Sequence, residues 1–181
     1  MAFSEPEVNL AHLHFDGNAV VVDLGSGSGH YSFAAAKRMQ NGHGKVIAVD
    51  VQRDMLVKLK REAGSRGLHN LEIVHGDLDE ARSTGLRDES VDAVIVSNIL
   101  FQLEERDIFA QEVTRILKEG GEMLAVDWTD SWGGLGPVSS AVVAEDIAVA
   151  LFERHGLTLL ERFIAGEHHW GLIFIRRASS N

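Results

Sequence analysis

The amino-acid sequence predicts an α/β fold in which a doubly wound, mostly parallel sheet carries helices on both faces. Short apolar segments with the pattern of strands alternate with segments of helical periodicity from residue 19 to residue 155. The apolar content of the strands is nearly continuous, as in Val20, Val21 and Val22. Strands that are covered on both faces have this composition, so helices are expected on both sides of the sheet.

Five strands and four helices follow one another in this alternation. The strands are expected at residues 19–24, 45–50, 71–75, 91–97 and 121–127. The helices are expected at residues 31–40, 52–66, 104–118 and 140–155. In the third helix Ile108, Phe109, Val113 and Ile116 form one apolar stripe opposite charged residues, which is typical of a helix packed on a sheet.

The last two strands differ from the others. Residues 157–163 and 170–176 both have the pattern of strands, and only six residues separate them. A parallel crossover needs about a dozen residues, so the last strand must run antiparallel to its neighbour if the two pair. The sequence thus predicts five parallel strands with helices, followed by a terminal hairpin.

Length and composition indicate one globular domain. The chain has 181 residues, of which 45% are hydrophobic and 24% charged. Neither a repeat nor a linker-like segment interrupts it. We expect residues 1–181 to form a single domain in which residues 1–18 are a short N-terminal arm.

Charge and cysteine content exclude several classes of function. The net charge of −10 disfavours binding to nucleic acid or to an anionic membrane, where basic side chains supply most of the affinity. The absence of cysteine excludes disulfide frameworks, iron–sulfur clusters and thiol nucleophiles. Glu5 and Glu7 stand where a signal peptide would be basic, and no apolar segment approaches the roughly 20 residues of a membrane helix. We therefore expect a cytoplasmic protein.

The first strand leads into a glycine-rich loop. Residues 22–30 read Val-Asp-Leu-Gly-Ser-Gly-Ser-Gly-His, in which glycines allow a sharp turn and the next helix offers free N–H groups. In the dinucleotide fingerprint G-x-G-x-x-G the third glycine would fall at His30. Asp23 would repel a pyrophosphate but suits the ammonium group of an amino-acid moiety. A tight turn without a ligand is the alternative interpretation.

Short segments that each contain a polar residue also stand at the ends of the next three strands. They are Asp50 and Val51 after the second strand, Asp77 and Leu78 after the third, and Ser97 and Asn98 after the fourth. Asp50 can accept hydrogen bonds from ribose hydroxyls, Val51 can pack on an adenine face, and Asp77 can accept from an adenine amino group. Either acid alone could be a helix or turn cap. Together, at the edge where open α/β sheets bind ligands, they predict a nucleoside site.

The motifs resemble those of the class I S-adenosylmethionine-dependent methyltransferases from about residue 18 to residue 177. Residues 21–29 look like the first motif of that family, residues 49–56 are similar to the second, and residues 74–78 look like the adenine-contacting motif. Residues 115–121 resemble the helix and turn before the fifth strand. The resemblance implies a Rossmann-like, doubly wound seven-stranded sheet, mostly parallel with the last strand antiparallel. It also implies S-adenosylmethionine as the cofactor and S-adenosylhomocysteine as its product.

The resemblance further implies which residues hold the cofactor. Gly25 and Gly27 would line its methionine part, Asp50 would hold the ribose, and Asp77 and Leu78 would meet the adenine. The expected set is Asp23, Gly25, Ser26, Gly27, Gly29, Asp50, Val51, Asp77, Leu78, Ser97 and Asn98. No metal ion is expected, because the closest histidine pairs, His12/His14 and His168/His169, come without a carboxylate at a familiar ligand spacing.

Three departures from the pattern of the family limit the possible classes of methyl acceptor. Phe101 and Gln102 stand where small-molecule methyltransferases often carry a histidine, so no histidine base is expected there. Asn98 is not followed by the two prolines of the branch that methylates amino groups of nucleic acids. The branch that methylates arsenite relies on cysteines, and this chain has none. We expect a small-molecule acceptor, whose identity the sequence does not indicate. The sequence does not indicate the oligomeric state either.

A long segment after the fifth strand is expected to face this acceptor. Residues 127–137 contain three glycines and two tryptophans and exceed the 2–6 residues usual for such loops. Long loops at this edge tend to carry function, although a plain connector over a buried Trp128 is the alternative. Trp128 and Trp132 would form a mobile wall over the acceptor. The candidate catalytic residues are Asp127 and Asp130, with His30 and Tyr31 as further candidates.

The predicted function is therefore methyl transfer from S-adenosylmethionine to a small molecule. The sulfonium is a strong electrophile, so the main task of the protein is to align the acceptor atom with the methyl group. A nicotinamide-dependent oxidoreductase would share the fold and Asp50, but His30 and Asp23 argue against it. A non-catalytic S-adenosylmethionine-binding protein would keep the strand-end motifs and lack an acceptor pocket.

Overall fold

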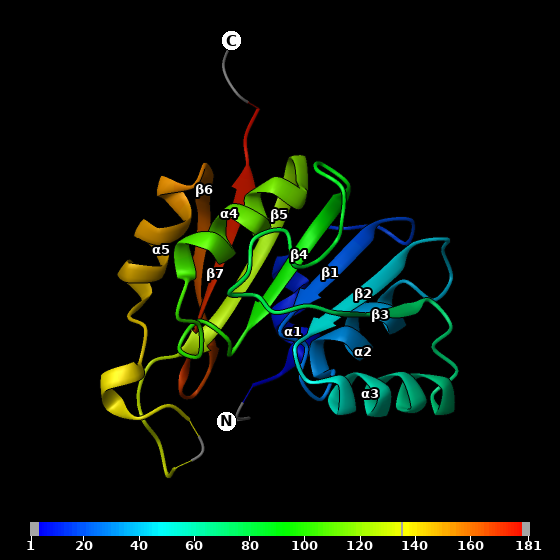
Figure 1. The fold of residues 1–181 in the computed structure, drawn as a ribbon, viewed down its shortest axis with the longest axis horizontal. Coiled ribbons are helices and arrows are strands. Elements are labelled where there is room, and N and C mark those ends of the chain that lie inside the picture. The colour runs from blue at the N-terminus through cyan, green and yellow to red at the C-terminus, as the bar shows by residue number, and fades with distance from the viewer. Residues whose placement is uncertain (1–3, 135, 179–181) are drawn as a thin grey trace.

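The computed structural model describes residues 4–134 and 136–178, and its centre is a seven-stranded sheet (Figure 1). The strand order is β3-β2-β1-β4-β5-β7-β6. The strands are β1 (Val20–Leu24), β2 (Lys45–Asp50), β3 (Leu71–His75), β4 (Val91–Ser97), β5 (Leu117–Trp128), β6 (Leu157–Gly166) and β7 (His169–Arg176). Strands β1 to β5 are parallel to their neighbours in this group, and β7 is antiparallel to both β5 and β6. The predicted fold class and the antiparallel last strand are confirmed.

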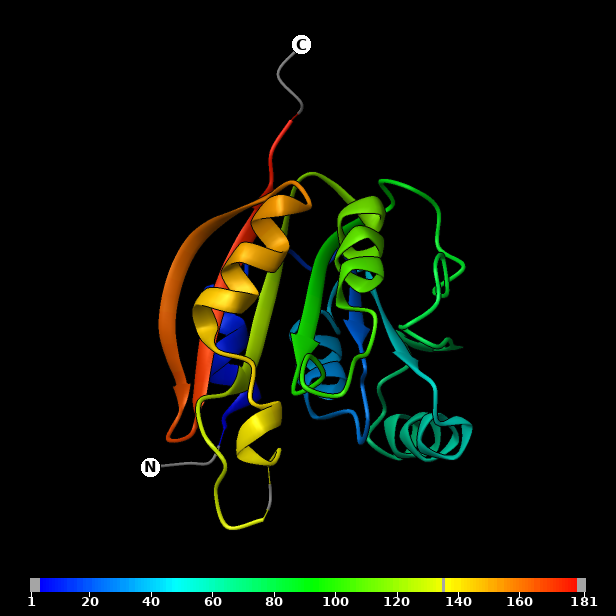
Figure 2. The same ribbon diagram turned by 60° about the vertical axis from the view of Figure 1, so that its left-hand side comes forward.

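Two layers of helices enclose the sheet. The helices are α1 (Pro6–Asn9), α2 (His30–Arg38), α3 (Arg53–Ser65), α4 (Arg106–Ile116) and α5 (Glu145–Arg154), with short 3-10 turns at η1 (Leu10–His12) and η2 (Ser139–Ala141). Buried residues of α4 and α5 share one apolar cluster, and those of α2 and α3 share another. Figure 2 shows α4 and α5 together on one side of the strands.

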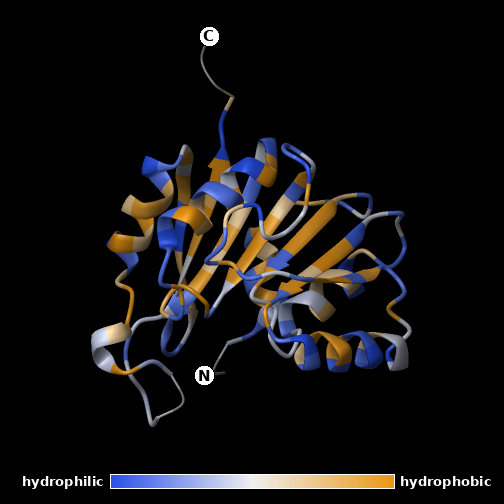
Figure 3. Cartoon of the chain, viewed as in Figure 1, coloured by the Kyte–Doolittle hydropathy of each residue, from blue (hydrophilic) through white to orange (hydrophobic). Residues whose placement is uncertain are grey.

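Alternation along each strand divides its side chains between these clusters. In β1, Val22 and Leu24 belong to the cluster under α4 and α5, whereas Val21 belongs to the cluster under α2 and α3. Both faces of the strand are therefore apolar, as expected for a sheet covered on two sides. Figure 3 shows the same distribution, with hydrophobic strands inside and hydrophilic residues gathered in loops and on the outer sides of helices.

The sheet reverses its direction of growth at β1. The chain runs outward from β1 to β2 and β3, then returns to place β4 on the other side of β1. The loops after β1 and β4 therefore diverge, which opens a crevice at the C-terminal ends of these strands. The fold places the glycine-rich loop and residues 97–98 at the two sides of this crevice.

Two helices have other boundaries in the structure than the sequence predicts. The third was expected at residues 104–118 but α4 ends at Ile116, because Leu117 already pairs with Val91 at the start of β5. The fourth was expected from residue 140, but α5 begins only at Glu145. The Val143 carbonyl accepts a hydrogen bond from the indole N–H of Trp170 at 3.1 Å, and the backbone at Val142 and Ala144 is not helical.

Candidate functional site

The glycine-rich loop after β1 is held to the neighbouring strand by its backbone. The N–H groups of Gly25 and Ser26 donate to the Val49 carbonyl at 2.9 and 3.0 Å. Gly25, Gly27 and Gly29 all have positive φ, at 77°, 49° and 85°, where a side chain would be strained. A Cβ on Gly25 or Gly29 would also collide with neighbouring side chains, whereas one on Gly27 would meet nothing within 4 Å. The loop is thus open toward solvent at Gly27.

Asp50 at the end of β2 fixes this loop from the side. One carboxylate oxygen accepts the N–H of Gly27 at 2.8 Å, and the other accepts the N–H of Gln52 at 2.8 Å. The side chain of Asp50 is buried, and its backbone carbonyl accepts the N–H of Gly76. The ends of β1, β2 and β3 are therefore connected through a single residue.

A cavity of about 460 Å³ lies between the glycine-rich loop and the end of β4. Most of its lining comes from the loop, the first turn of α2 and the segment after β4, and the rest comes from the N-terminal segment. The lining residues are Ser4, Pro6, Asp23, Gly25, Ser26, Gly27, Ser28, His30, Tyr31, Ser97, Asn98 and Gln102. Of the predicted cofactor residues, Asp23, Gly25, Ser26, Gly27, Ser97 and Asn98 meet here.

Asp23 places a carboxylate at the bottom of this cavity. It is 2% exposed, and one oxygen accepts a hydrogen bond from the Ser32 hydroxyl at 2.5 Å. Burial raises the pKa of Asp23 to about 6, against the lowering effect of the Ser32 hydrogen bonds. Burial disfavours the ionised carboxylate, so a cationic ligand group beside it would stabilise the ionised form.

Asn98 faces the cavity from the other side. Its φ of 55° is left-handed, a conformation that asparagine adopts more readily than most residues. Its N–H donates to the Val126 carbonyl at 2.9 Å, and its own carbonyl accepts from Gln102 Nε2 at 2.8 Å. Asn98 Oδ1 and Ser26 Oγ are buried without a hydrogen-bond partner among the described residues. Asp23, Ser26 and Asn98 all line the cavity, and a donor-bearing ligand that reaches their side-chain oxygens would give these oxygens a partner.

The N-terminal segment closes one end of the cavity. Asn9 Nδ2 donates to the Tyr31 hydroxyl at 2.8 Å and to the Ala165 carbonyl at 3.0 Å. Ser4 Oγ lies 3.3 Å from the Tyr31 hydroxyl. Residues 4–9 are therefore attached both to α2 and to β6, and they form a wall of the site where only a short arm was predicted.

Comparison with known families agrees with this geometry. A family profile described as a methyltransferase domain matches residues 15–148, which include the glycine-rich loop, Asp50, Asp77 and Asn98. The chain belongs to the class I S-adenosylmethionine-dependent methyltransferases.

Two curated relatives are longer than the segment that they share with this chain, whereas one solved structure matches it over almost its whole length. An arsenite methyltransferase of Aquipseudomonas alcaligenes is 36% identical over 112 residues, which are 59% of this chain and 32% of that protein. A ubiquinone/menaquinone biosynthesis C-methyltransferase of Haemophilus ducreyi is 28% identical over 113 residues, 60% of this chain and 41% of that protein. The chain thus spans about a third of the length of the first of these curated relatives and two fifths of the second. A S-adenosylmethionine-dependent methyltransferase structure from Aquifex aeolicus superposes with a TM-score of 0.86 at 24% identity, covering 96% of this chain and 90% of that one.

The predicted adenine-side residues of the methyltransferase lie apart from the cavity. Val51 is 51% exposed, and Asp77 is an exposed residue whose carboxylate accepts the N–H of Asp79 at 3.1 Å. Leu78 is buried in the core. Gly76 connects this region to Asp50, so these residues flank the ends of β2 and β3 but do not line the 460 Å³ cavity.

Asp127 lies in a closed environment. It is 1% exposed, and its two oxygens accept the N–H groups of Leu100 and Trp128 at 2.9 and 2.8 Å. Burial raises the pKa of Asp127 to about 6. The geometry shows Asp127 holding the segment after β4 in place, and its catalytic role stays a prediction.

The segment after β5 folds against the β6–β7 turn. Asp130 pairs with His168 Nδ1 at 3.0 Å, and the ring of Trp132 stacks on His168 with centroids 4.8 Å apart. Trp128 is buried, with its ring 4.4 Å from that of His169. Neither tryptophan and neither of the predicted acids lines the cavity. Leu135, inside the predicted acceptor loop, lies outside the described residues.

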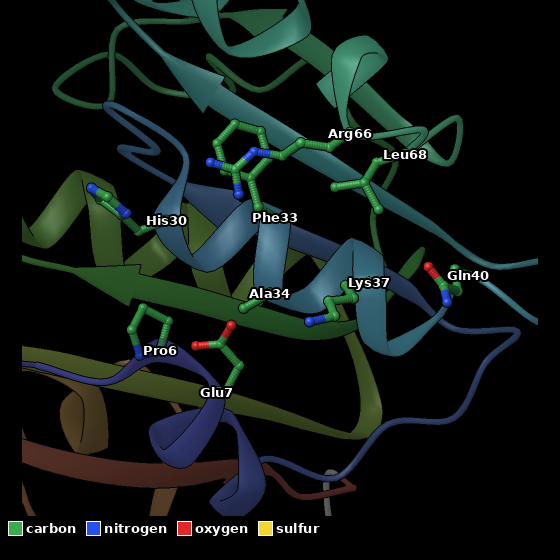
Figure 4. Close-up of a pocket in the computed structure, with 9 residues that line it drawn as sticks. All are labelled: Pro6, Glu7, His30, Phe33, Ala34, Lys37, Gln40, Arg66 and Leu68. Carbon is green, nitrogen blue, oxygen red and sulfur yellow. The ribbon is translucent and has the colours of Figure 1, made fainter. Parts of the chain in front are cut away.

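A second hollow, of about 470 Å³, runs along the outer side of α2 (Figure 4). Figure 4 shows Pro6 and Glu7 on one side of α2 and Arg66 on the other, with His30, Phe33 and Lys37 between them. The guanidinium of Arg66 lies 4.3 Å from the centre of the Phe33 ring. Pro6 and His30 line both hollows, so the groove adjoins the cavity at the start of α2.

Sequence reasoning missed Ser4, Pro6, Asn9 and Gln102. A proline at the start of a helix followed by a glutamate is a known N-terminal signal, so Pro6 and Glu7 could have indicated α1. The position of this helix over the cavity depends on contacts with Tyr31 and Ala165, which are distant in the sequence.

Residues 4–134 and 136–178 contain neither a metal-binding cluster nor a membrane-spanning helix. No group of three histidine, aspartate or glutamate side chains there is arranged to hold a metal ion. No helix there is long and apolar enough to cross a bilayer.

Proposed function

We propose that this methyltransferase transfers the methyl group of S-adenosylmethionine to a small-molecule acceptor. The observation that carries the proposal is the cavity between the glycine-rich loop and β4, with its three oxygen acceptors at Asp23, Ser26 and Asn98. A ligand with an ammonium group at this end would satisfy all three. When bound, S-adenosylmethionine would supply an electrophilic methyl group.

The remaining predicted residues fit the other parts of this cofactor. Gly27 leaves open space beside the main chain, so a ligand can approach the loop closely there. The Asp50 carboxylate accepts two backbone N–H groups and retains further lone pairs for ribose hydroxyls. Val51 offers an exposed apolar face, and Asp77 an exposed carboxylate, at the ends of β2 and β3.

The chain's own task in the reaction is to position the acceptor and exclude water. Alignment of the reacting atoms contributes most where the electrophile is already activated. The walls of the cavity, which include Ser4, Pro6, Tyr31 and Gln102, would exclude water from the bound cofactor. An acceptor that must lose a proton would need a base, and His30, Asp127 and Asp130 stay candidates for that role.

A small organic molecule is the acceptor class that we propose, rather than arsenite or nucleic acid. The first of the relatives described above is named for arsenite, whose soft arsenic(III) centre prefers thiolate ligands, but this chain has no cysteine. The net charge of −10 opposes binding to phosphate backbones. The quinone-pathway relative is named for carbon methylation, which supports an organic acceptor.

Calorimetric titration of the purified chain tests the cofactor, and a methyl-release screen against a metabolite library tests the acceptor. We expect S-adenosylmethionine and S-adenosylhomocysteine to bind and NAD not to bind. Comparable affinity for NAD would contradict the proposal and favour an oxidoreductase. Binding of S-adenosylhomocysteine without turnover of any library compound would favour a cofactor-binding protein without catalysis.

A further inference from the structure

The cavity contains no lysine or arginine among the described residues that line it. Its anionic group is Asp23, which suits the ammonium of an amino-acid moiety. The cofactor of the proposed function carries a carboxylate next to that ammonium. Among the described lining residues, the groups that can donate to this carboxylate are His30 and neutral donors, not a lysine or an arginine.

The orientation of Asn9 determines which way the nearest hydroxyl points. Asn9 is 2% exposed and lies between the Tyr31 hydroxyl and the Ala165 carbonyl. A carbonyl can only accept, so Ala165 identifies the neighbouring end of the carboxamide as the NH₂ group. The same NH₂ group contacts the Tyr31 hydroxyl at 2.8 Å and must donate to it.

Tyr31 consequently has its own proton to donate. Its oxygen accepts from Asn9, so the O–H is directed elsewhere, toward the side chain of Ser4 or Ser97 or into the cavity that Tyr31 lines. Burial raises the pKa of Tyr31 above its usual value, and the Asp23 carboxylate raises it further, so the hydroxyl stays protonated at neutral pH. A protonated hydroxyl whose oxygen already accepts a hydrogen bond is a suitable donor to a carboxylate.

We propose that Tyr31 donates a hydrogen bond to the carboxylate at the amino-acid end of the cofactor, and that Asn9 is the positioning residue that orients Tyr31 for it. The inference rests on the proposed function. The cavity then recognises both charges of an amino-acid group, the ammonium through Asp23, Ser26 and Asn98, and the carboxylate through Tyr31. The N-terminal helix is in this way part of the cofactor site.

The first test compares two ligands that differ in the amino-acid group. S-adenosylhomocysteine carries it, and 5′-methylthioadenosine lacks it. We define the ligand ratio as the dissociation constant of 5′-methylthioadenosine divided by that of S-adenosylhomocysteine. Measured by calorimetry, this ratio gives the contribution of the amino-acid end to binding. Tyr31→Phe should reduce this ratio at least 10-fold, because hydrogen bonds to charged groups are the stronger ones. An unchanged ratio in Tyr31→Phe overturns the inference.

The second test is spectroscopic and uses the fact that the chain has one tyrosine. Protein labelled with ¹³C at the tyrosine Cζ gives a single resonance that reports on Tyr31. Donation to a carboxylate moves the phenol toward phenolate character, so S-adenosylhomocysteine should shift this resonance downfield and 5′-methylthioadenosine should not. Equal shifts with both ligands contradict the inference.

Variants of Asn9 test the positioning role. In Asn9→Asp the side chain accepts in place of donating, so the Tyr31 O–H should turn toward it, and the ligand ratio should fall as in Tyr31→Phe. Asn70→Asp is the matched control, because Asn70 Nδ2, like that of Asn9, donates to a backbone carbonyl, here that of Ala36, whereas only Asn9 also donates to the cavity-lining Tyr31. It should keep the wild-type ratio.

The outcomes separate this inference from the proposed function. If neither adenosyl ligand binds the wild-type protein, the proposed cofactor is wrong. If both bind with a large ratio that Tyr31→Phe leaves intact, the cofactor stands and the role of Tyr31 and Asn9 is wrong. If Asn9→Asp does not fold, Tyr31→Phe and the Cζ resonance still decide.

Discussion

At the scale of single residues, Asp23 couples the protonation of the site to the stability of the protein. Its pKa of about 6 in the folded protein lies above its ordinary value of 3.8, so the folded state holds this proton more tightly than the unfolded chain. The associated stability is therefore fully present below pH 4 and is lost as the pH rises to about 6. The total is about 3 kcal/mol, from a shift of about two units at 1.36 kcal/mol each. Asp23→Asn should remove this dependence, so denaturant unfolding of the ligand-free variant at pH 7 should give a higher free energy than the wild type.

The same carboxylate gives the opposite dependence for ligand binding. A cationic ligand group favours ionised Asp23, so S-adenosylhomocysteine should bind more tightly as the pH rises from 5 to 7.5. Asp23→Asn should bind more weakly at pH 7.5 and lose most of the pH dependence. A variant that is more stable and binds as well as the wild type would show that Asp23 does not contact the ligand.

Asn98 allows backbone conformation and side-chain chemistry to be separated. Asn98→Gly keeps the left-handed backbone without strain and removes the carboxamide, whereas Asn98→Ala removes the carboxamide and adds a backbone cost of about 1–2 kcal/mol. If the carboxamide binds the cofactor, both variants should lose about 10-fold in affinity for S-adenosylhomocysteine by calorimetry. Wild-type affinity in Asn98→Gly would limit the role of this residue to the turn.

At the scale of elements, the sequence predicts those structural features that depend on residues close to one another in the chain. The loop from Gly25 to Gly29 is recognisable because its turn, its strand and its helix are adjacent in sequence. The end of α4 was wrong by two residues because the apolar stripe continues through Leu117, which pairs with β4 instead. The wall that α1 forms was not predictable, because Asn9 acts through Tyr31 and Ala165, 22 and 156 residues away.

The segment from Thr129 to Gly136 was predicted to face the acceptor, and this stays a prediction. Asp130 and Trp132 in this segment contact His168, and neither lines the cofactor cavity. Replacing it by a short Gly-Ser turn should therefore keep the affinity for S-adenosylhomocysteine within about 3-fold, or roughly 0.7 kcal/mol. Methyl transfer to an acceptor found in the screen should fall by about 10² if the loop positions it. Normal turnover would make the segment a connector, and loss of the cofactor would place it on the other side of the site.

At the scale of the whole molecule, ligand binding should appear as added stability. A ligand at about 100 times its dissociation constant adds about 2.7 kcal/mol to the free energy of unfolding. For a chain of this length, that corresponds to a rise in Tm of about 5–10 °C. S-adenosylhomocysteine should produce such a rise by differential scanning fluorimetry, and Asp50→Ala should reduce it at the same ligand concentration. An equal rise with NAD would argue against the assigned cofactor.

The bond between Asn9 and Ala165 also has a consequence for how the protein is made. A ribosome delivers residue 9 long before residue 165, so the N-terminal helix emerges without one of the two partners that hold it. The strands β1 to β5 can assemble from contacts closer in sequence, while the site stays open on its N-terminal side. Synthesis of the β6–β7 hairpin then supplies the Ala165 carbonyl and closes that side. Completion of the cofactor site is thereby linked to synthesis of this hairpin, and a polypeptide truncated before it would lack one of the contacts that hold the N-terminal helix beside the cavity.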